Sequence, residues 1–345
     1  MATIRDVARK ANVSTGTVSM YLNGRDGISE SKRKQIEKAI RKLGYQARKR
    51  GRPRAVQQTQ SRNIAFMLFG TNLDSLGDIH ALKRQFIVGI RDALMMRQVH
   101  LSLFLDGRPI QEDDLFQDMV EHGQFDGVII TGADPEESDL EWLRAMQVPV
   151  ILLNRPTADR DISFVTIDNE SASAKVADHF YGQGHRRMAI VDHAGTYAWI
   201  RGRREGFLNR VRELDAELVA KERLDPDGPA STCHEVCDNI IKSGATAVFV
   251  VNDGMAVKCI DTWHEQGLEI PRDLSVVGFD DLGYRSQNDL RLSSVTYDKQ
   301  AIGEYAVQML MEKIDRPNIV MSMGMHLQGE IVDYDTTSQP PKTAR

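Results

Sequence analysis

Polar side chains follow several of the apolar runs in this sequence, at positions where strands of a sheet would end. Thr131, Asn154, Asn252 and Asp280 lie at or just after the ends of such runs, and Arg203 lies at the start of a helical stretch that follows another. Ligands of parallel α/β sheets bind beyond the carboxyl ends of the strands. Fixed donors and acceptors at that edge suit a small polar molecule, so the pattern makes these residues candidates for binding a ligand such as a sugar or a purine.

Further carboxylates share this position in the pattern, namely Asp192, Asp253 and Asp281. For Asp253 and Asp281 an ordinary structural role competes with ligand binding, because an aspartate at the start of a helix commonly caps that helix. The residue types and their spacing leave both interpretations open.

The sequence lacks the signatures of common enzyme sites. It contains no Gly-x-Ser-x-Gly nucleophile elbow, no Gly-x-x-x-x-Gly-Lys phosphate loop and no His-Glu-x-x-His metal pair. Cys233, His234 and Cys237 form an incomplete metal set without zinc-finger spacing, and we expect them to be ordinary helix residues. We therefore predict that the chain is not an enzyme, has no catalytic or metal-binding residues and needs no cofactor.

The net charge of the chain, −5, is divided unevenly along it. Residues 1–60 hold 15 Lys and Arg against 4 Asp and Glu, whereas the remainder holds 29 against 45. A basic segment on an acidic chain is typical of a nucleic-acid-binding domain, and a solvated basic tail is the alternative. The apolar pattern inside the basic segment decides between them.

Residues 1–46 have the apolar spacing of three short helices. The first carries apolar residues on one face at Ile4, Val7, Ala8 and Ala11. Ser14 is placed to cap a second helix, Thr15 to Asn23, and a third begins near Ser29 and ends at Gly44. Two helices joined by a three-residue turn inside a basic segment predict a helix-turn-helix, with helix packing without DNA as the alternative.

The second helix of a helix-turn-helix enters the major groove, and its first residues face the bases. Thr15 offers a hydroxyl, Gly16 allows close approach of the backbone, and Met20 can contact a thymine methyl but cannot pair with guanine as arginine does. The residues of this domain that we predict to contact DNA are Thr3, Ser14, Thr15, Gly16, Thr17, Ser19, Met20 and Asn23.

A basic linker, residues 47–61, follows this domain. Its centre reads Arg50, Gly51, Arg52, Pro53 and Arg54. An extended chain of this composition fits the narrow minor groove of A·T-rich DNA, whose negative potential attracts arginine. The segment is similar to an AT-hook, and we predict that these five residues contact DNA; a merely basic linker is the alternative.

From residue 62 onward, short apolar runs alternate with amphipathic helical stretches, as in parallel α/β folds. The runs that we expect to be strands are 64–69, 101–105, 127–131, 148–153, 164–167, 188–192, 247–251 and 274–279. The stretches that we expect to be helices are 79–97, 113–123, 172–183, 203–214 and 255–266. This order predicts an all-α head followed by two α/β lobes, each built on a doubly wound parallel sheet, with a ligand cleft between the lobes.

The chain resembles the LacI/GalR family of bacterial transcription regulators from residue 3 to about residue 331. The match is nearly residue for residue in the head, at Thr3-Ile4-Arg5-Asp6-Val7-Ala8, Ala11-Asn12-Val13-Ser14 and Thr17-Val18-Ser19. Further matches lie in both lobes, at 165–169, 184–187, 203–207, 252–256 and 276–281. The resemblance implies a homodimeric regulator, a repressor rather than an activator, that binds a near-palindromic operator in double-stranded DNA and an effector between its lobes, of periplasmic-binding-protein type.

The resemblance also implies roles for individual residues of the effector site. Arg203 matches the effector-binding arginine of the family, Asn252 and Asp280 match its polar contacts from the second lobe, and Asn154 lies where the family often has an aspartate. The aromatic platform that the family often has near residue 224 is absent from this sequence. Trp199 or Tyr197 is the candidate replacement, with ordinary packing as the alternative.

The domain boundaries that we predict follow the same resemblance. The DNA-binding domain is 1–46, the linker 47–61, the two-lobed domain 62–335 and the C-terminal tail 336–345. Within the two-lobed domain we assign 62–160 and 292–320 to the first lobe, and 161–291 and 321–335 to the second.

The linker departs from the family pattern. The family usually has a short hinge helix whose leucine wedges into the central minor-groove step of the operator, but residues 46–60 contain no Leu, Ile, Met or Phe. Gly51 and Pro53 also disfavour a helix. Our hypothesis is that Arg50, Arg52 and Arg54 occupy the minor groove instead, which favours an operator with an A·T-rich centre.

Composition excludes a membrane role. No apolar run approaches the ~18 residues of a membrane span, and residues 1–22 lack the apolar core of a secretory signal. The 3 cysteines cannot form a disulfide framework. We therefore predict a cytoplasmic protein without a membrane partner.

Overall fold

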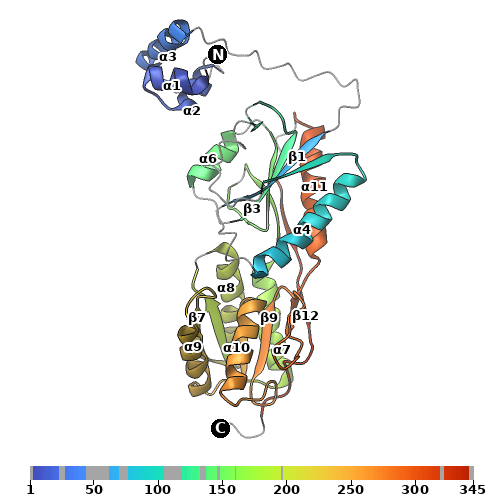
Figure 1. The fold of residues 1–345 in the computed structure, drawn as a ribbon. Coiled ribbons are helices and arrows are strands. Elements are labelled where there is room, and N and C mark those ends of the chain that lie inside the picture. The colour runs from blue at the N-terminus through green and yellow to red at the C-terminus, as the bar shows by residue number, and fades with distance from the viewer. Residues whose placement is uncertain are drawn as a thin grey trace. The chain divides into compact units, whose positions relative to one another are not determined.

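The computed structural model divides the chain into two units, Met1–Gln60 and Ser61–Arg345, each held together by its own contacts (Figure 1). The residues that the structure describes are 3–22, 28–43, 62–69, 77–104, 119–120, 122–132, 137–145, 148–159, 161–195, 197–318 and 322–341. Several predictions lie outside these residues, namely the DNA contacts Asn23, Arg50, Gly51, Arg52, Pro53 and Arg54 and the first half of the predicted helix 113–123.

The first unit contains the three predicted helices, α1 (Ile4–Ala11), α2 (Thr15–Leu22) and α3 (Glu30–Leu43). A reciprocal capping pair starts α1, because the Thr3 hydroxyl accepts from the Asp6 amide and the Asp6 carboxylate accepts from the Thr3 amide. Asn12 ends the helix in a left-handed conformation, with φ of 53°. Fully buried apolar side chains from all three helices, Val7, Val18 and Ile36, form the core of this domain.

The second unit contains two six-stranded sheets, one in each lobe (Figure 1). In the first sheet the strand order is β11-β5-β4-β3-β1-β2, and every neighbouring pair is parallel. Its strands are β1 (Asn63–Phe69), β2 (His100–Phe104), β3 (Gly127–Gly132), β4 (Val150–Leu153), β5 (Ser163–Ile167) and β11 (Gly324–Leu327). The central strands β3 and β4 are buried along their whole length, as expected for a sheet covered on both faces.

The second sheet has the order β12-β10-β9-β8-β6-β7. Its strands are β6 (Arg187–His193), β7 (Glu217–Leu224), β8 (Ala247–Val250), β9 (Ser275–Phe279), β10 (Ser293–Thr296) and β12 (Glu330–Val332). All neighbouring pairs are parallel except β10 with β12, which is antiparallel. The predicted fold class of a helical head and two parallel α/β lobes is therefore confirmed, with one antiparallel edge strand added.

The helices of the second unit are α4 (Gly77–Met95), α6 (Glu137–Ala145), α7 (Asn169–Gln183), α8 (Ala198–Glu213), α9 (Ala230–Lys242), α10 (Asp253–Glu265) and α11 (Lys299–Asp315). α4 packs on α11, and α7 packs on α8 (Figure 1). Glycines allow both contacts, since a Cβ at Gly89 would lie 2.0 Å from the Gln300 carbonyl oxygen and one at Gly206 would lie 2.1 Å from the Glu170 carbonyl oxygen. None of the described helices is long and apolar enough to span a bilayer.

The predicted lobe boundaries are wrong at three strands. β5 and β11, which we assigned to the second lobe, pair with each other in the first sheet, and β5 also pairs with β4. β10, which we assigned to the first lobe, pairs with β9 in the second sheet. An apolar run marks a strand but carries no information about its sheet partner, because that pairing depends on contacts distant in sequence.

Candidate functional site

Arg203 is the centre of a buried hydrogen-bond network in the second lobe. Its side chain is 2% exposed, and its Nη1 and Nη2 donate to the two carboxylate oxygens of Asp280 at 3.1 and 2.8 Å. Nη1 also donates to the carbonyl of Val251 at 2.8 Å, and Nε donates to Oδ1 of Asn169 at 3.0 Å. Four of the five N–H groups of the guanidinium are therefore occupied, and the bidentate pair balances its charge.

Two aromatic rings pack against this guanidinium. The guanidinium carbon lies 3.6 Å from the ring centroid of Phe279 and 4.6 Å from that of Trp199. Trp199 in turn stacks on Tyr197, with ring centroids 6.2 Å apart and an interplanar angle of 10°. The two residues thus pack on each other, and Trp199 also packs on Arg203.

Asp280 also accepts from Tyr297, whose hydroxyl donates at 2.9 Å to Oδ1, the same oxygen that accepts from Nη2 of Arg203. Asp280 and Asp281 both follow β9 in left-handed conformations, with φ of 104° and 44°. The backbone amide of Asp281 donates to the hydroxyl of Ser294. No helix begins after Asp281 in this described segment, so the capping alternative for that residue is wrong.

Asn252 and Asp253 have different roles at the start of α10. Oδ1 of Asn252 accepts from the Met255 amide at 2.9 Å, so Asn252, and not Asp253, caps this helix. Asp253 is 2% exposed and accepts from the Ser294 hydroxyl at 2.6 Å and the Leu282 amide at 2.8 Å. Burial, reinforced by the nearby charge of Asp280, raises the pKa of Asp253 to about 8.

The raised pKa of Asp253 predicts that this residue lowers stability as the pH rises. Between the unfolded pKa of about 3.9 and the folded value, the folded state holds a proton that the unfolded state has lost, so the free energy of unfolding falls with increasing pH. Asp253→Asn removes this titration. We expect urea unfolding at pH 5 and pH 8 to show a smaller pH-dependent loss of stability in the variant, and an equal loss in both proteins would contradict the assignment.

The predicted site residues of the first lobe lie at the carboxyl ends of two neighbouring strands. Thr131 is buried near the end of β3, and Asn154 directly follows β4 with φ of 55°. Oδ1 of Asn154 accepts from the hydroxyl of Thr166 at 3.3 Å. The next residue, Arg155, reaches the second lobe, where its guanidinium carbon lies 5.9 Å from the ring centroid of Tyr197.

Some of the predicted site residues are thus hydrogen-bonded to one another, and others are not. Arg203 and Asp280 are bonded to each other, and Arg203 also contacts the backbone of Val251, next to Asn252. Among the described residues, no hydrogen bond connects Arg203, Asp280 or Asn252 with Thr131 or Asn154. Sequence reasoning missed Asn169, although it lies in one of the matching motifs, and it missed the buried cations Lys83 and Arg155 of the first lobe.

A pocket of about 340 Å³ opens beside Tyr197 in the second lobe. Four cationic side chains line it, namely Arg201, Arg204, Lys221 and Arg223. Asp192, its one carboxylate, is 1% exposed, accepts from Arg204 at 3.1 Å and also accepts from the amide of His193. The pocket therefore carries an excess of positive charge.

The predicted base-reading residues of α2 are accessible. Thr15, Gly16 and Met20 are exposed, whereas Thr17 and Ser19 are half-buried. Ser14 caps the helix by accepting from the Thr17 amide at 3.1 Å, and its hydroxyl lies 2.8 Å from that of Thr17. The hydroxyls of Ser14 and Thr17 thus form a hydrogen bond with each other. The side chains of Thr15 and Met20 are exposed and therefore accessible to DNA bases.

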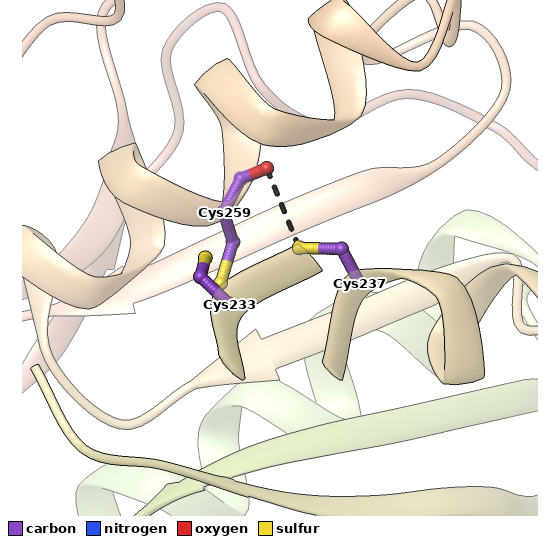
Figure 2. A group of neighbouring side chains, drawn as sticks. All are labelled: Cys233, Cys237 and Cys259. Carbon is purple, nitrogen blue, oxygen red and sulfur yellow. Dashed lines mark hydrogen bonds between the residues drawn. The ribbon is translucent and has the colours of Figure 1, made fainter. Parts of the chain in front are cut away.

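Three cysteines meet between α9 and α10 (Figure 2). The sulfurs of Cys233, Cys237 and Cys259 all lie within 4.8 Å of one another, and all three side chains are buried. Sequence reasoning considered Cys233 with Cys237 but missed Cys259, which only the packing of two helices brings close. Hydrogen bonding to the Cys233 and Cys237 thiols, reinforced by burial, raises the pKa of Cys259, whereas hydrogen bonding to the other two thiols lowers the pKa of Cys233.

Comparison with known proteins gives matches over both units. The family described as bacterial regulatory proteins, lacI family, matches residues 3–47, and the periplasmic binding protein-like domain matches residues 177–337. The probable HTH-type transcriptional repressor ExuR of Bacillus subtilis (strain 168) is 28% identical over 323 residues, covering 92% of this chain and 93% of the relative.

Two solved structures share the fold over nearly the whole chain. A complex of the transcriptional regulator CelR with cellobiose has a TM-score of 0.69 at 20% identity, covering 97% of this chain and 100% of the other. The lac repressor dimer bound to operator and the anti-inducer ONPF has a TM-score of 0.67 at 22% identity, covering 98% and 99%.

Proposed function

The chain belongs to the lacI family of bacterial regulatory proteins, and from that premise we propose that it is a sequence-specific transcription repressor controlled by a small polar effector. The observation that carries the proposal is the match of the lacI family to residues 3–47, where the chain forms a helix-turn-helix with Thr15, Gly16 and Met20 exposed on its second helix. The similarity to a repressor over both units supports it. A regulator of this kind acts on DNA in the cytoplasm.

The effector would bind between the lobes, with Thr131 and Asn154 on one side and Arg203, Asn252 and Asp280 on the other. The position of these residues at the ends of strands supports this assignment. Because Arg203 is already paired with Asp280, it has one N–H group left to offer, which suits a hydroxyl oxygen of a sugar-like ligand. A related fold bound to cellobiose is consistent with such a ligand.

Effector binding would control DNA binding by selecting one arrangement of the lobes. A ligand shifts an equilibrium between two arrangements only if it binds one of them better. An inducer would therefore prefer the arrangement that is incompatible with the operator, and a corepressor the compatible one.

On the DNA, two copies of the chain would each place α2 in the major groove of one half of a near-palindromic operator. Thr15, Gly16 and Met20 would face the bases. We further propose that Arg50, Arg52 and Arg54 enter the minor groove at the operator centre, where A·T-rich sequence gives the strongest negative potential. These three arginines lie outside the described residues, and the proposal for them rests on their spacing in the sequence.

Selection of binding sites from random DNA by the purified full-length chain tests the proposal. We expect a two-fold symmetric site with an A·T-rich centre, and we expect Arg52→Ala to lose the preference for that centre. Lys42→Ala, which removes one positive charge from the exposed end of α3, is the matched control and should keep it. Binding that shows no sequence preference and only weakens as the salt concentration rises would overturn the assignment as a sequence-specific repressor. If Arg52→Ala kept the preference for an A·T-rich centre, the proposed role of the linker would be wrong.

A further inference from the structure

Among the residues that the structure describes, Lys83 is a buried cation with no hydrogen-bond partner. It lies in the second turn of α4, its side chain is 7% exposed, and its Nζ makes no hydrogen bond. Burial, reinforced by the positive charge of Arg155, lowers the pKa of Lys83 to about 7. An unpaired buried ammonium is strongly destabilising, so the position calls for an anion that is not one of the described side chains.

The topology puts this lysine near the predicted effector site. α4 follows the parallel strand β1, so its first turns lie at the carboxyl edge of the first sheet, the edge that carries Thr131 and Asn154. Arg155 directly follows Asn154, influences Lys83 electrostatically and approaches Tyr197 of the second lobe. Lys83 and Arg155 are therefore both basic side chains at the carboxyl edge of the first sheet, and Arg155 approaches the second lobe.

Further positive charge lies in the second lobe, around the pocket that Tyr197 lines. The pocket beside this ring is lined by four cations against the single carboxylate of Asp192. Cationic walls around a partly enclosed space raise the local concentration of anions. Arg203 does not supply this charge, because Asp280 balances it.

We propose that the effector is an anion, a sugar-like molecule with a carboxylate or a phosphate group, and that this acidic group pairs with Lys83 between the lobes. The inference rests on the proposed function for the location of the effector. An anion beside Lys83 would hold the ammonium in its charged form and replace the hydration that burial removes, and a charge-assisted hydrogen bond would fix its orientation.

Thermal unfolding of the full-length chain with matched ligands tests the charge requirement. D-glucuronate and D-glucose differ only at C6, which belongs to a carboxylate in the first and to a hydroxymethyl group in the second. Glucose 6-phosphate carries a phosphate on the C6 oxygen. We expect at least one of the two anions to raise the Tm of the wild-type chain at concentrations where glucose does not. The stronger of the two identifies the acidic group.

Two lysine variants show whether Lys83 is the residue through which the anion stabilises the chain. Lys83→Met is expected to have an unliganded Tm equal to or above that of the wild type, and to bind the stabilising anion about tenfold to a hundredfold more weakly. Lys242→Met removes the same charge from an exposed lysine of α9 and should respond like the wild type. Stabilisation by glucose alone, no response to either anion, or an equal response in Lys83→Met would overturn the proposal.

Operator binding separates this inference from the proposed function. If glucose releases the operator and the anions do not, the regulator stands and the anionic effector is wrong. If an anion stabilises the chain through Lys83 but operator binding is sequence-blind, the anion site stands and the repressor is wrong.

Discussion

Arg203→Met is expected to lower the free energy of unfolding of the two-lobed unit by about 3–5 kcal/mol, because it leaves the carboxylate of Asp280 buried without its counter-charge. Asp280 is 6% exposed, and after the substitution only the hydroxyl of Tyr297 would remain among its side-chain donors. The variant should also lose effector binding, since Arg203 orients both Asp280 and Asn169. Urea unfolding followed by tryptophan fluorescence measures the loss.

The control for this prediction is the double variant Arg203→Met with Asp280→Asn. Removing both charges together avoids the unpaired carboxylate, so the double variant should be more stable than Arg203→Met alone. All three tryptophans, at positions 142, 199 and 263, lie in the two-lobed unit, so their fluorescence does not report unfolding of the DNA-binding unit. Equal stability of the single and double variants would show that the ion pair is not the source of the effect.

The strands that the sequence predicted correctly are those with continuous apolar runs. β3 and β8, for example, are buried along their whole length, and both were located within one or two residues. β7 was missed because it is an edge strand with the sequence ELVAKERL, in which charged residues lie on exposed positions. β11 and β12 are short and half-exposed, so they also lack an apolar run. Three of the four edge strands thus lack the apolar run on which the prediction depends, because edge strands are covered on fewer sides, whereas the edge strand β2 was located from its run at 101–105.

The candidate site shows a different limit of prediction. Arg203 and Asp280 were identified individually, but no pattern in the sequence indicates that they pair with each other across 77 residues. Lys83 was missed because a lysine in an amphipathic helix is ordinarily on the solvated face, and its burial depends on what the rest of the chain packs against it. The charge balance of a site is a property of tertiary packing, and in this chain the Asp280 carboxylate balances the charge of Arg203 and leaves it one N–H group for a ligand.

Gly206→Ala is expected to destabilise the two-lobed unit by about 1–3 kcal/mol, although alanine is a better helix former than glycine. The added Cβ would lie 2.1 Å from the carbonyl oxygen of Glu170, so α8 must move away from α7. Because Asn169 begins α7 and Arg203 lies on α8, the same movement stretches the Arg203–Asn169 hydrogen bond and weakens effector binding.

Gly182→Ala, in α7, is the matched control. A Cβ there meets no atom within 4 Å, so the free energy of unfolding should rise by up to about 1 kcal/mol. If urea unfolding shows a loss of stability in Gly206→Ala and a gain in Gly182→Ala, close helix contact, and not helix propensity, requires glycine at position 206. A gain of stability in both variants would show that α7 and α8 separate easily.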